Sequence, residues 1–384
     1  MKIGKYCAIL GNALGTHEME QLVNTRPLAT LPFDGKYRLI DFQLSNLVNA
    51  GITNIYGIFS QKNVPSVLDH IRTGREWGLN TLLDHFFVGF YNNDDSDAEK
   101  TVCDPTYYPH LLTFLRRSHS TYTIFSTADI LCNINLEQLI HVHEVNQRTM
   151  SVVYKKMPKE QLSSVNSVLE LDSSDTVTSV IRYEDSVYQE DDFVSMSTGI
   201  YIVNTDFMIR MMEVEQHQDA PRKLRYLLLE KLVELGALGY EYTGYMKNIY
   251  DVKSYYDANM DMLDPKKFTS LLHATQKIYT KVKNEEATYF ANSSEIFNSQ
   301  FSSGSVIYGR VENSIVSRRC QLEKEAVIKN SIIFPNVKIG SGAHIEYAIL
   351  DKEVEIASGV KIIGTNEHPI IIEKYGRVTE DVTL

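Results

Sequence analysis

Hydrophobic residues follow two different spacings along the first part of the chain. Short apolar runs at Tyr6–Leu10, Ile52–Ser60 and Thr121–Ser126 are typical of buried strands, whereas Tyr37–Ala50 carries apolar residues at helical spacing. Gly51 is placed to end that helix. The other elements predicted in this way are helices over Val64–Arg72, Leu136–Arg148, Asp206–Val214 and Pro221–Leu235, and strands over Ser151–Tyr154, Ser167–Leu171, Thr176–Tyr183 and Val194–Asn204.

This alternation of strands and helices implies a largely parallel sheet covered on both faces. In such sheets, ligands bind beyond the carboxyl ends of the strands. We therefore expect any chemistry of this domain in the segments that follow Leu10, Phe59 and Ser126.

The C-terminal part of the chain contains an internal repeat. Three consecutive segments align without a gap, namely Glu312–Ile328, Lys329–Ile345 and Glu346–Ile362. Aliphatic residues lie about six positions apart within each segment, as in hexapeptide repeats, and a fixed period of this kind marks a solenoid whose coils bury a shared core. The repeat predicts a left-handed parallel β-helix. We expect an α/β domain over 1–265, a linker over 266–295 and the β-helix over 296–384.

Composition narrows the range of functions. The chain has 38 basic and 49 acidic residues, a net charge of −11, which argues against binding to nucleic acid. It contains no apolar run of about 18 residues, so no transmembrane helix is expected. The N-terminus lacks a cleavable signal pattern, and a cytoplasmic location is expected. The four cysteines are too widely spaced to indicate a disulfide framework or a zinc site (Cys7, Cys103, Cys132, Cys320).

One segment is specific enough to indicate a family. From Pro32 to Asn46 the chain reads PFDGKYRLIDFQLSN, which resembles the motif PFGGKYRLIDFxLSN of glucose-1-phosphate adenylyltransferase (ADP-glucose pyrophosphorylase). Met196–Tyr201 and Tyr255–Leu263 are similar to two further motifs of that family. The resemblance implies a Rossmann-like nucleotidyltransferase domain with a mixed sheet, followed by the left-handed β-helix.

The positions that carry catalysis in that family are altered here. The family's RAKP motif corresponds to Arg26–Ala29, with Leu28 at the lysine, and its GDHIY motif corresponds to Thr127–Leu131, with Ala128 at a metal-binding aspartate. The sugar-phosphate motif FxEKP and the motif GYWRDV, which holds the second metal aspartate, are altered in the same way. The residues at their key positions are Tyr183 and Asn248.

The phosphate loop after Leu10 also departs from the family pattern. It has two glycines four residues apart, Gly11 and Gly15, and then the acidic residues Glu18 and Glu20, which would repel a nucleotide. Adenylyl transfer needs Mg²⁺ on hard oxygen ligands and cations on the phosphates. The pattern resembles the D-type, regulatory subunit of two-component glucose-1-phosphate adenylyltransferases. It implies a chain without a cofactor of its own that assembles, as a heterotetramer, with a catalytic subunit that uses Mg²⁺.

Basic residues remain beside the retained motif. Arg26, Lys36 and Arg38 match positions that contact anionic effectors in the catalytic relatives, so we expect them to form an effector site for sugar phosphates or nucleotides. Salt bridges within the fold are an equally good explanation of these charges.

Two alternatives stay open from the sequence. The chain could be an active nucleotidyltransferase with repositioned metal ligands such as Asp129 and Asp251, or a β-helix acyltransferase with His344 as general base. The acidic segment Asn92–Glu99 lacks the glycine and final glutamate of a known calcium loop.

Overall fold

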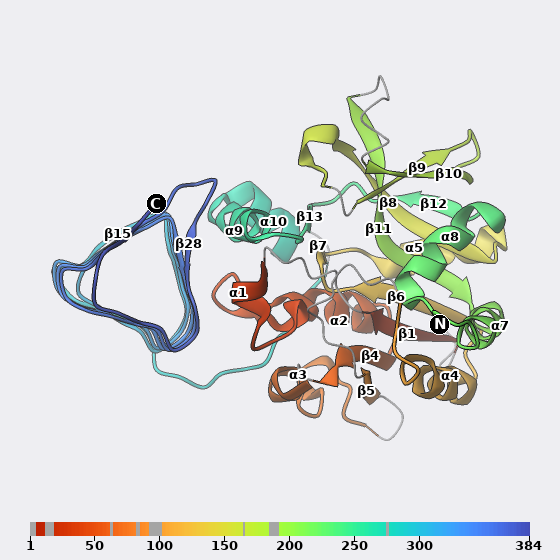
Figure 1. The fold of residues 1–384 in the computed structure, drawn as a ribbon, viewed down its shortest axis with the longest axis horizontal. Helices are drawn as coiled ribbons and strands as arrows, with labels where there is room; N and C mark the ends of the chain where they lie inside the picture. The colour runs from red at the N-terminus through yellow and green to blue at the C-terminus, as the bar shows by residue number, and fades with distance from the viewer. Residues whose placement is uncertain are drawn as a thin grey trace.

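The computed structural model describes residues 5–11, 19–61, 64–81, 85–91, 102–163, 166–183, 192–273 and 276–384. An N-terminal α/β domain lies beside a triangular β-helix, with the helices α9 and α10 between them (Figure 1). The predicted fold class, an α/β domain with a mixed sheet followed by a parallel β-helix, is therefore confirmed.

The α/β domain is built on a 9-stranded sheet in which β10, β9, β11, β6, β1, β4 and β5 follow one another, with β8 beside β11 and β12 beside β8. The pairs β6–β1, β1–β4 and β4–β5 are parallel, whereas β11 runs antiparallel to β6, β8 and β9. The antiparallel part is thus larger than the alternation of elements suggests. The strands are β1 (Tyr6–Gly11), β4 (Asn54–Ser60), β5 (His85–Tyr91), β6 (Tyr122–Thr127), β8 (Met150–Pro158), β9 (Ser167–Leu171), β10 (Val177–Arg182), β11 (Phe193–Asn204) and β12 (Leu238–Glu241).

Helices cover both faces of this sheet. Two separate two-stranded sheets accompany it: β2 (Pro32–Phe33) pairs with β3 (Tyr37–Arg38), and β7 (Ile130–Cys132) pairs with β13 (Met246–Asn248). The helices are α1 (Glu20–Val23), α2 (Leu39–Asn49), α3 (Val64–Ile71), α4 (Tyr107–Ser118), α5 (Leu136–Asn146), α7 (Thr205–Glu215), α8 (Leu224–Glu234), α9 (Val252–Met260) and α10 (Pro265–Leu272).

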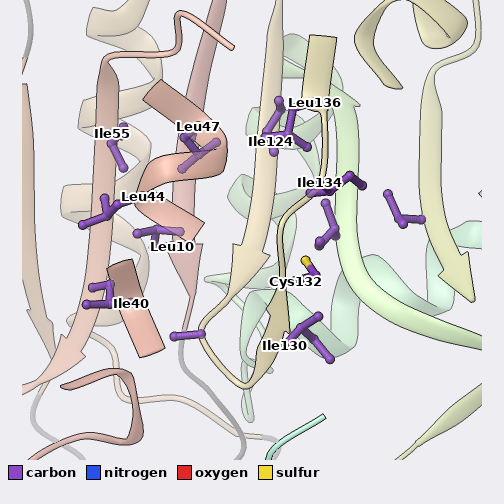
Figure 2. Packing of buried hydrophobic residues seen from close by; sticks show 14 of the residues in the cluster. Leu10, Ile40, Leu44, Leu47, Ile55, Ile124, Ile130, Cys132, Ile134 and Leu136 are labelled. Atoms are coloured by element: carbon purple, nitrogen blue, oxygen red, sulfur yellow. The ribbon is translucent and has the colours of Figure 1, made fainter. Parts of the chain in front are cut away.

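Helix α2 begins two residues later than its apolar spacing predicts. Tyr37 and Arg38 belong to β3, and the Arg38 backbone N–H donates to the Asp41 carboxylate at 2.9 Å. This contact closes the first turn of the helix, as in a capping box. One face of α2 then packs on the sheet through Ile40, Leu44 and Leu47 (Figure 2).

The β-helix has three parallel sheets, and residues 17 apart are direct neighbours in its central coils. Ile315 pairs with Ile332, and Ile332 with Ile349, which confirms the period read from the sequence. The first sheet contains β14 (Tyr289–Phe290), β17 (Val306–Ile307), β20 (Gln321–Leu322), β23 (Lys338–Ile339), β26 (Glu355–Ile356) and β29 (Arg377–Val378). The second contains β15 (Glu295–Phe297), β18 (Arg310–Glu312), β21 (Val327–Lys329), β24 (His344–Glu346), β27 (Lys361–Ile363) and β30 (Val382–Thr383). The third contains β16 (Gln300–Phe301), β19 (Ile315–Val316), β22 (Ile332–Ile333), β25 (Ala348–Leu350) and β28 (Ile370–Ile372).

The third sheet faces the α/β domain, and the two domains share one hydrophobic cluster. Ile315, Ile332 and Phe334 of the β-helix pack in it with Tyr255 of α9 and Phe33 of β2. The ring centroids of Tyr255 and Phe334 lie 6.4 Å apart, edge to face. The two domains are therefore joined by a continuous hydrophobic core.

A buried ion pair crosses the same contact. Arg26, which is 3% exposed, lies 2.5 Å from the carboxylate of Asp351 in the β-helix, which is 1% exposed. The Arg26 guanidinium also lies over the Phe334 ring. Because both charges are out of water, each depends on the other for compensation.

We predict that Arg26→Met destabilises the protein strongly, because it leaves the Asp351 carboxylate buried and unpaired. The expected loss in the free energy of unfolding is about 3–5 kcal/mol. Denaturant unfolding followed by circular dichroism measures it.

A matched control is the exposed pair Arg116–Glu213, also 2.5 Å apart. Arg116→Met should cost less than about 1 kcal/mol. Replacing both buried charges, as Arg26→Met with Asp351→Leu, should recover most of the loss. Equal effects of the two single variants would contradict the interpretation.

Candidate functional site

The carboxyl end of β6 lies next to β13, so the fold brings together the two positions where the resemblance places metal-binding aspartates. Asn248 pairs with Ile130, two residues beyond Ala128, and the Ile249 N–H donates to the Asp129 carbonyl at 2.8 Å. Ala128 is buried and offers only a methyl group. Asn248 is also buried, and its Oδ1 has no hydrogen-bond partner.

Asp129, the candidate for a repositioned metal ligand, is neutralised by an arginine. Its Oδ2 accepts a hydrogen bond of 2.7 Å from Nη1 of Arg225 on α8. Burial acts to lower the pKa of Arg225, but the Asp129 carboxylate outweighs this and raises the pKa.

This set of donors does not fit Mg²⁺. The ion needs several oxygen ligands, usually including carboxylates. Here one position is a methyl group, one is a neutral amide and the nearby carboxylate already holds a guanidinium. Within the described ranges, no group of three or more His, Cys, Asp and Glu side chains could hold a metal ion.

The other altered positions have structural roles. Leu28 is buried in the cluster shared by the two domains, and Tyr183 packs against the main core of the α/β domain. Asp251 caps α9, because its side chain accepts from the Ser254 N–H at 2.6 Å. Glu20 is exposed at the start of α1. Gly15 and Glu18 lie outside the described residues, as does the acidic segment 92–99.

A second site lies between the two domains. It is a cleft of about 1020 Å³ lined by the β2–β3 turn, the segment after α10 and the facing coils of the β-helix. Seven lysine and arginine residues line it, against two carboxylates. The basic residues are Lys36, Arg38, Lys277, Lys281, Lys283, Arg318 and Lys352, and the acidic ones are Asp34 and Glu76.

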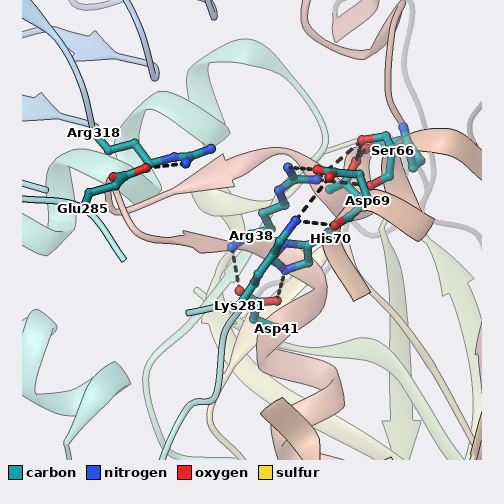
Figure 3. A network of polar contacts seen from close by, with 10 residues as sticks. Arg38, Asp41, Ser66, Asp69, His70, Lys281, Glu285 and Arg318 are labelled. Atoms are coloured by element: carbon teal, nitrogen blue, oxygen red, sulfur yellow. Dashed lines mark hydrogen bonds and ion pairs between the residues drawn. The ribbon is translucent and has the colours of Figure 1, made fainter. Parts of the chain in front are cut away.

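Several of these cations have partners in the fold (Figure 3). Arg38 donates to the Ser66 carbonyl at 3.3 Å and lies 3.6 Å from Asp69, which also contacts Lys281 at 3.2 Å. Arg318 lies 2.7 Å from Glu285. Among the residues that the structure describes, Lys36 and Lys352 form no ion pair. The cleft therefore has an excess of positive charge.

Burial perturbs the titration of groups in this cleft. It lowers the pKa of Lys352 to about 7, with help from the nearby charges of Arg38 and Arg26. It raises the pKa of Asp34 to about 7, although Lys36 acts in the opposite direction. An anion bound among these lysines would favour their charged form.

The residues expected to bind effectors are only partly brought together. Lys36 and Arg38 line the cleft, whereas Arg26 lies outside its lining and pairs with Asp351. The sequence reasoning missed Lys281, Arg318 and Lys352, because they come from the linker and the β-helix. Only the period of the β-helix, which fixes the sheet that faces the α/β domain, could have pointed to them.

The remaining candidates are explained by the fold. His344, the candidate general base, lies 3.2 Å from Glu346 on the same strand of the β-helix. All four cysteines are buried and free. None of the helices in the described ranges is long and apolar enough to cross a membrane.

Comparison with known proteins identifies the family. The nucleotidyl transferase family matches residues 19–265, and the GlmU-like C-terminal hexapeptide family matches residues 282–383. The glycogen biosynthesis protein GlgD of Bacillus subtilis is 29% identical over 93% of this chain and 92% of its own length. Glucose-1-phosphate adenylyltransferases of Clostridium perfringens and Bacillus cereus are 28% and 26% identical, over 92% and 81% of this chain and 89% and 82% of their own lengths.

The resemblance read from the sequence is confirmed by these matches, which extend over both domains. Relatives that are adenylyltransferases and a relative named only for glycogen biosynthesis are about equally similar to the chain. The chain belongs to the nucleotidyl transferase family, and its C-terminal part matches the GlmU-like C-terminal hexapeptide family.

Proposed function

We propose that this chain is a non-catalytic or weakly active regulatory subunit of glucose-1-phosphate adenylyltransferase. It would assemble with a catalytic subunit that forms ADP-glucose from ATP and glucose 1-phosphate. The observation that carries the proposal is the Arg225–Asp129 ion pair between two neutral residues at the metal positions, Ala128 and Asn248. An arginine fixed at this point supplies charge balance but leaves no ligand set for Mg²⁺.

The surface of the first β-helix coil supports the assembly. Tyr289, Phe290 and Phe297 are 56%, 43% and 50% exposed, and the strands that carry them lie at the ends of their sheets. Exposed aromatic side chains next to unpaired strand edges mark a surface that a partner covers. We propose that the catalytic subunit is this partner and that the complex is a heterotetramer.

The cleft between the domains supports a regulatory role. Its excess positive charge favours an anionic effector such as a sugar phosphate or a nucleotide. Because the cleft is lined by both domains, a ligand there can favour one relative arrangement of them over another.

We predict that the purified chain alone has no ordinary adenylyltransferase activity. Each lost group that would stabilise the transition state electrostatically lowers the catalytic rate by a factor of about 10²–10³. Release of diphosphate from ATP, Mg²⁺ and glucose 1-phosphate measures it. Turnover at about 1 per second or faster would refute the proposal. Ala128→Asp with Asn248→Asp should not restore the activity, because Leu28, Tyr183 and Arg225 remain.

We predict that the chain co-elutes with a catalytic subunit when the two are co-expressed and separated by size-exclusion chromatography. Phe297→Ser should weaken the complex by about tenfold, which corresponds to the loss of one aromatic contact of about 1.4 kcal/mol. Val145→Ser on α5, where Val145 is 66% exposed, is the matched control. Separate elution of the two wild-type chains argues against assembly.

We predict that Lys36→Ala with Lys352→Ala weakens the response of the reconstituted complex to anionic effectors. Two lost charge-assisted contacts should raise the half-saturating effector concentration at least about tenfold. Lys361→Ala is the control, because Lys361 is exposed on the β-helix sheet that faces away from the α/β domain. An unchanged response in the double variant would place the effector site elsewhere.

A further inference from the structure

One corner of the β-helix carries positive charge in several coils. It follows the third sheet, which faces the α/β domain. The residues at this corner are Arg318, Pro335, Lys352 and Lys374, none of them acidic. The Glu353 N–H donates to the Pro335 carbonyl at 3.1 Å, and the Tyr375 N–H donates to the Lys352 carbonyl at 3.0 Å. These positions therefore stack from one coil to the next, at a spacing of about 4.8 Å.

Two of the three cations at this corner are stabilised by a partner. Arg318 lies 2.7 Å from the Glu285 carboxylate, and Nζ of Lys374 lies 4.5 Å from the centroid of the Tyr375 ring. Lys352 forms neither an ion pair nor a cation–π contact within the residues that the structure describes. Its ammonium group therefore has no compensation of this kind.

The carboxylate nearest to Lys352 in the sequence is already in use. Asp351 is paired with Arg26 at 2.5 Å, and its other oxygen accepts from the Lys352 backbone N–H, also at 2.5 Å. Arg38, whose own contacts are drawn in Figure 3, lines the same cleft as Lys352. The Lys352 side chain thus lies among cations, and their combined charge disfavours its ammonium form.

The amine of Lys352 is both partly neutral and accessible. Burial, together with the charges of Arg38 and Arg26, lowers the pKa of Lys352 to about 7. An ordinary lysine has a pKa of about 10.4, so its neutral fraction at neutral pH is roughly a thousandfold smaller. The Lys352 side chain is only partly buried and borders a cleft of about 1020 Å³, so a small molecule can reach it. Lys352 is therefore available as a nucleophile.

The cations that disfavour an ammonium group would stabilise an anion in its place. A lysine amine becomes an anion when it adds CO₂, because the product is a carbamate. CO₂ is small and uncharged, so the charges of the cleft do not hinder its approach. An acylated lysine, by contrast, is neutral and gains nothing from the surrounding cations.

We propose that Lys352 is a carbamylation site that takes up CO₂. The lone pair of the neutral Nζ attacks the carbon of CO₂, and a new N–C bond forms. One C–O π bond opens, its electron pair moves to the oxygen, and the nitrogen releases a proton to water. The product carries a negative charge near Arg38, Arg26 and Lys374.

Carbamylation inverts the charge of one residue at the contact between the domains. It makes the excess of positive charge in the cleft depend on dissolved CO₂. The inference goes beyond the proposed function, because it requires neither a catalytic partner nor an anionic effector.

The test is ¹³C NMR of the full-length chain in ¹³C-labelled bicarbonate near neutral pH, where the carbamate carbon is distinct from bicarbonate and CO₂. Wild-type protein should show a carbamate signal, and Lys352→Arg should lose it. Arginine keeps the positive charge, so thermal unfolding of this variant should match wild type. Alkylation of the carbamate with an oxonium reagent, followed by mass spectrometry of the peptides, should locate the modification at Lys352.

Matched controls use lysines in other surroundings. Lys36 borders the same cleft but is exposed, and its Nζ lies 5.3 Å from the centroid of the Tyr37 ring. Lys361 is exposed on the sheet that faces away from the α/β domain. Lys36→Arg and Lys361→Arg should both keep the signal. Lys374→Gln removes one neighbouring cation, and it should raise the CO₂ concentration for half-maximal modification about threefold to tenfold.

Three results would overturn the inference. If wild-type protein shows no carbamate signal, or if Lys352→Arg keeps it unchanged, Lys352 is not a carbamylation site. If Lys283→Arg loses the signal instead, the modified residue is a lysine of the linker. An unchanged CO₂ dependence in Lys374→Gln would contradict the role assigned to the cations. None of these results changes the effector response of the complex, so the proposed function is tested separately.

Discussion

The packing of the β-helix against the α/β domain is the contact on which the rest of the molecule depends. Buried side chains from both domains form one cluster, and the Arg26–Asp351 pair lies within it. An isolated domain would expose its own side of this cluster and one uncompensated charge. The cleft lies where the surfaces of the two domains meet, so its shape depends on how the domains are joined.

The same contact gives the motif after Pro32 a structural role in a chain that has Ala128 and Asn248 at the expected metal positions. Its residues hold structure: the Pro32 carbonyl accepts from the Tyr255 hydroxyl, and the Asp41 carboxylate contacts both the Arg38 backbone and His70. The contacts with Tyr255 and His70 join segments that are far apart in the sequence. The motif therefore connects the sheet, α9 and the β-helix, and this structural role does not depend on which residues occupy the metal positions.

Much of the fold could be predicted from the sequence, because its periodic parts follow local rules. The β-helix repeats every 17 residues in its central coils, and α2 and β4 have clear apolar patterns. β5 and α4 were not predicted. β5 is an edge strand with apolar residues on both faces, and α4 contains a proline near its start. The antiparallel half of the sheet was underestimated, since pairing direction depends on contacts that no local pattern encodes.

The candidate site could likewise be predicted from the sequence only in part. The altered residues at positions 28, 128, 183 and 248 could be read from motifs alone, but Arg225 could not, because it reaches Asp129 from a helix 96 residues away in sequence. The cations of the cleft were predicted only where they adjoin a motif. Those from the linker and the β-helix come together solely through tertiary packing.

The Arg225–Asp129 pair has a consequence for how the chain responds to its surroundings. A metal ion held by carboxylates comes and goes with the free concentration of that ion, and the loops around it tighten and loosen accordingly. A guanidinium attached through α8 cannot dissociate, and it stays charged across the physiological pH range. The charge balance at the centre of this domain is therefore set by the chain itself and does not depend on a bound ion.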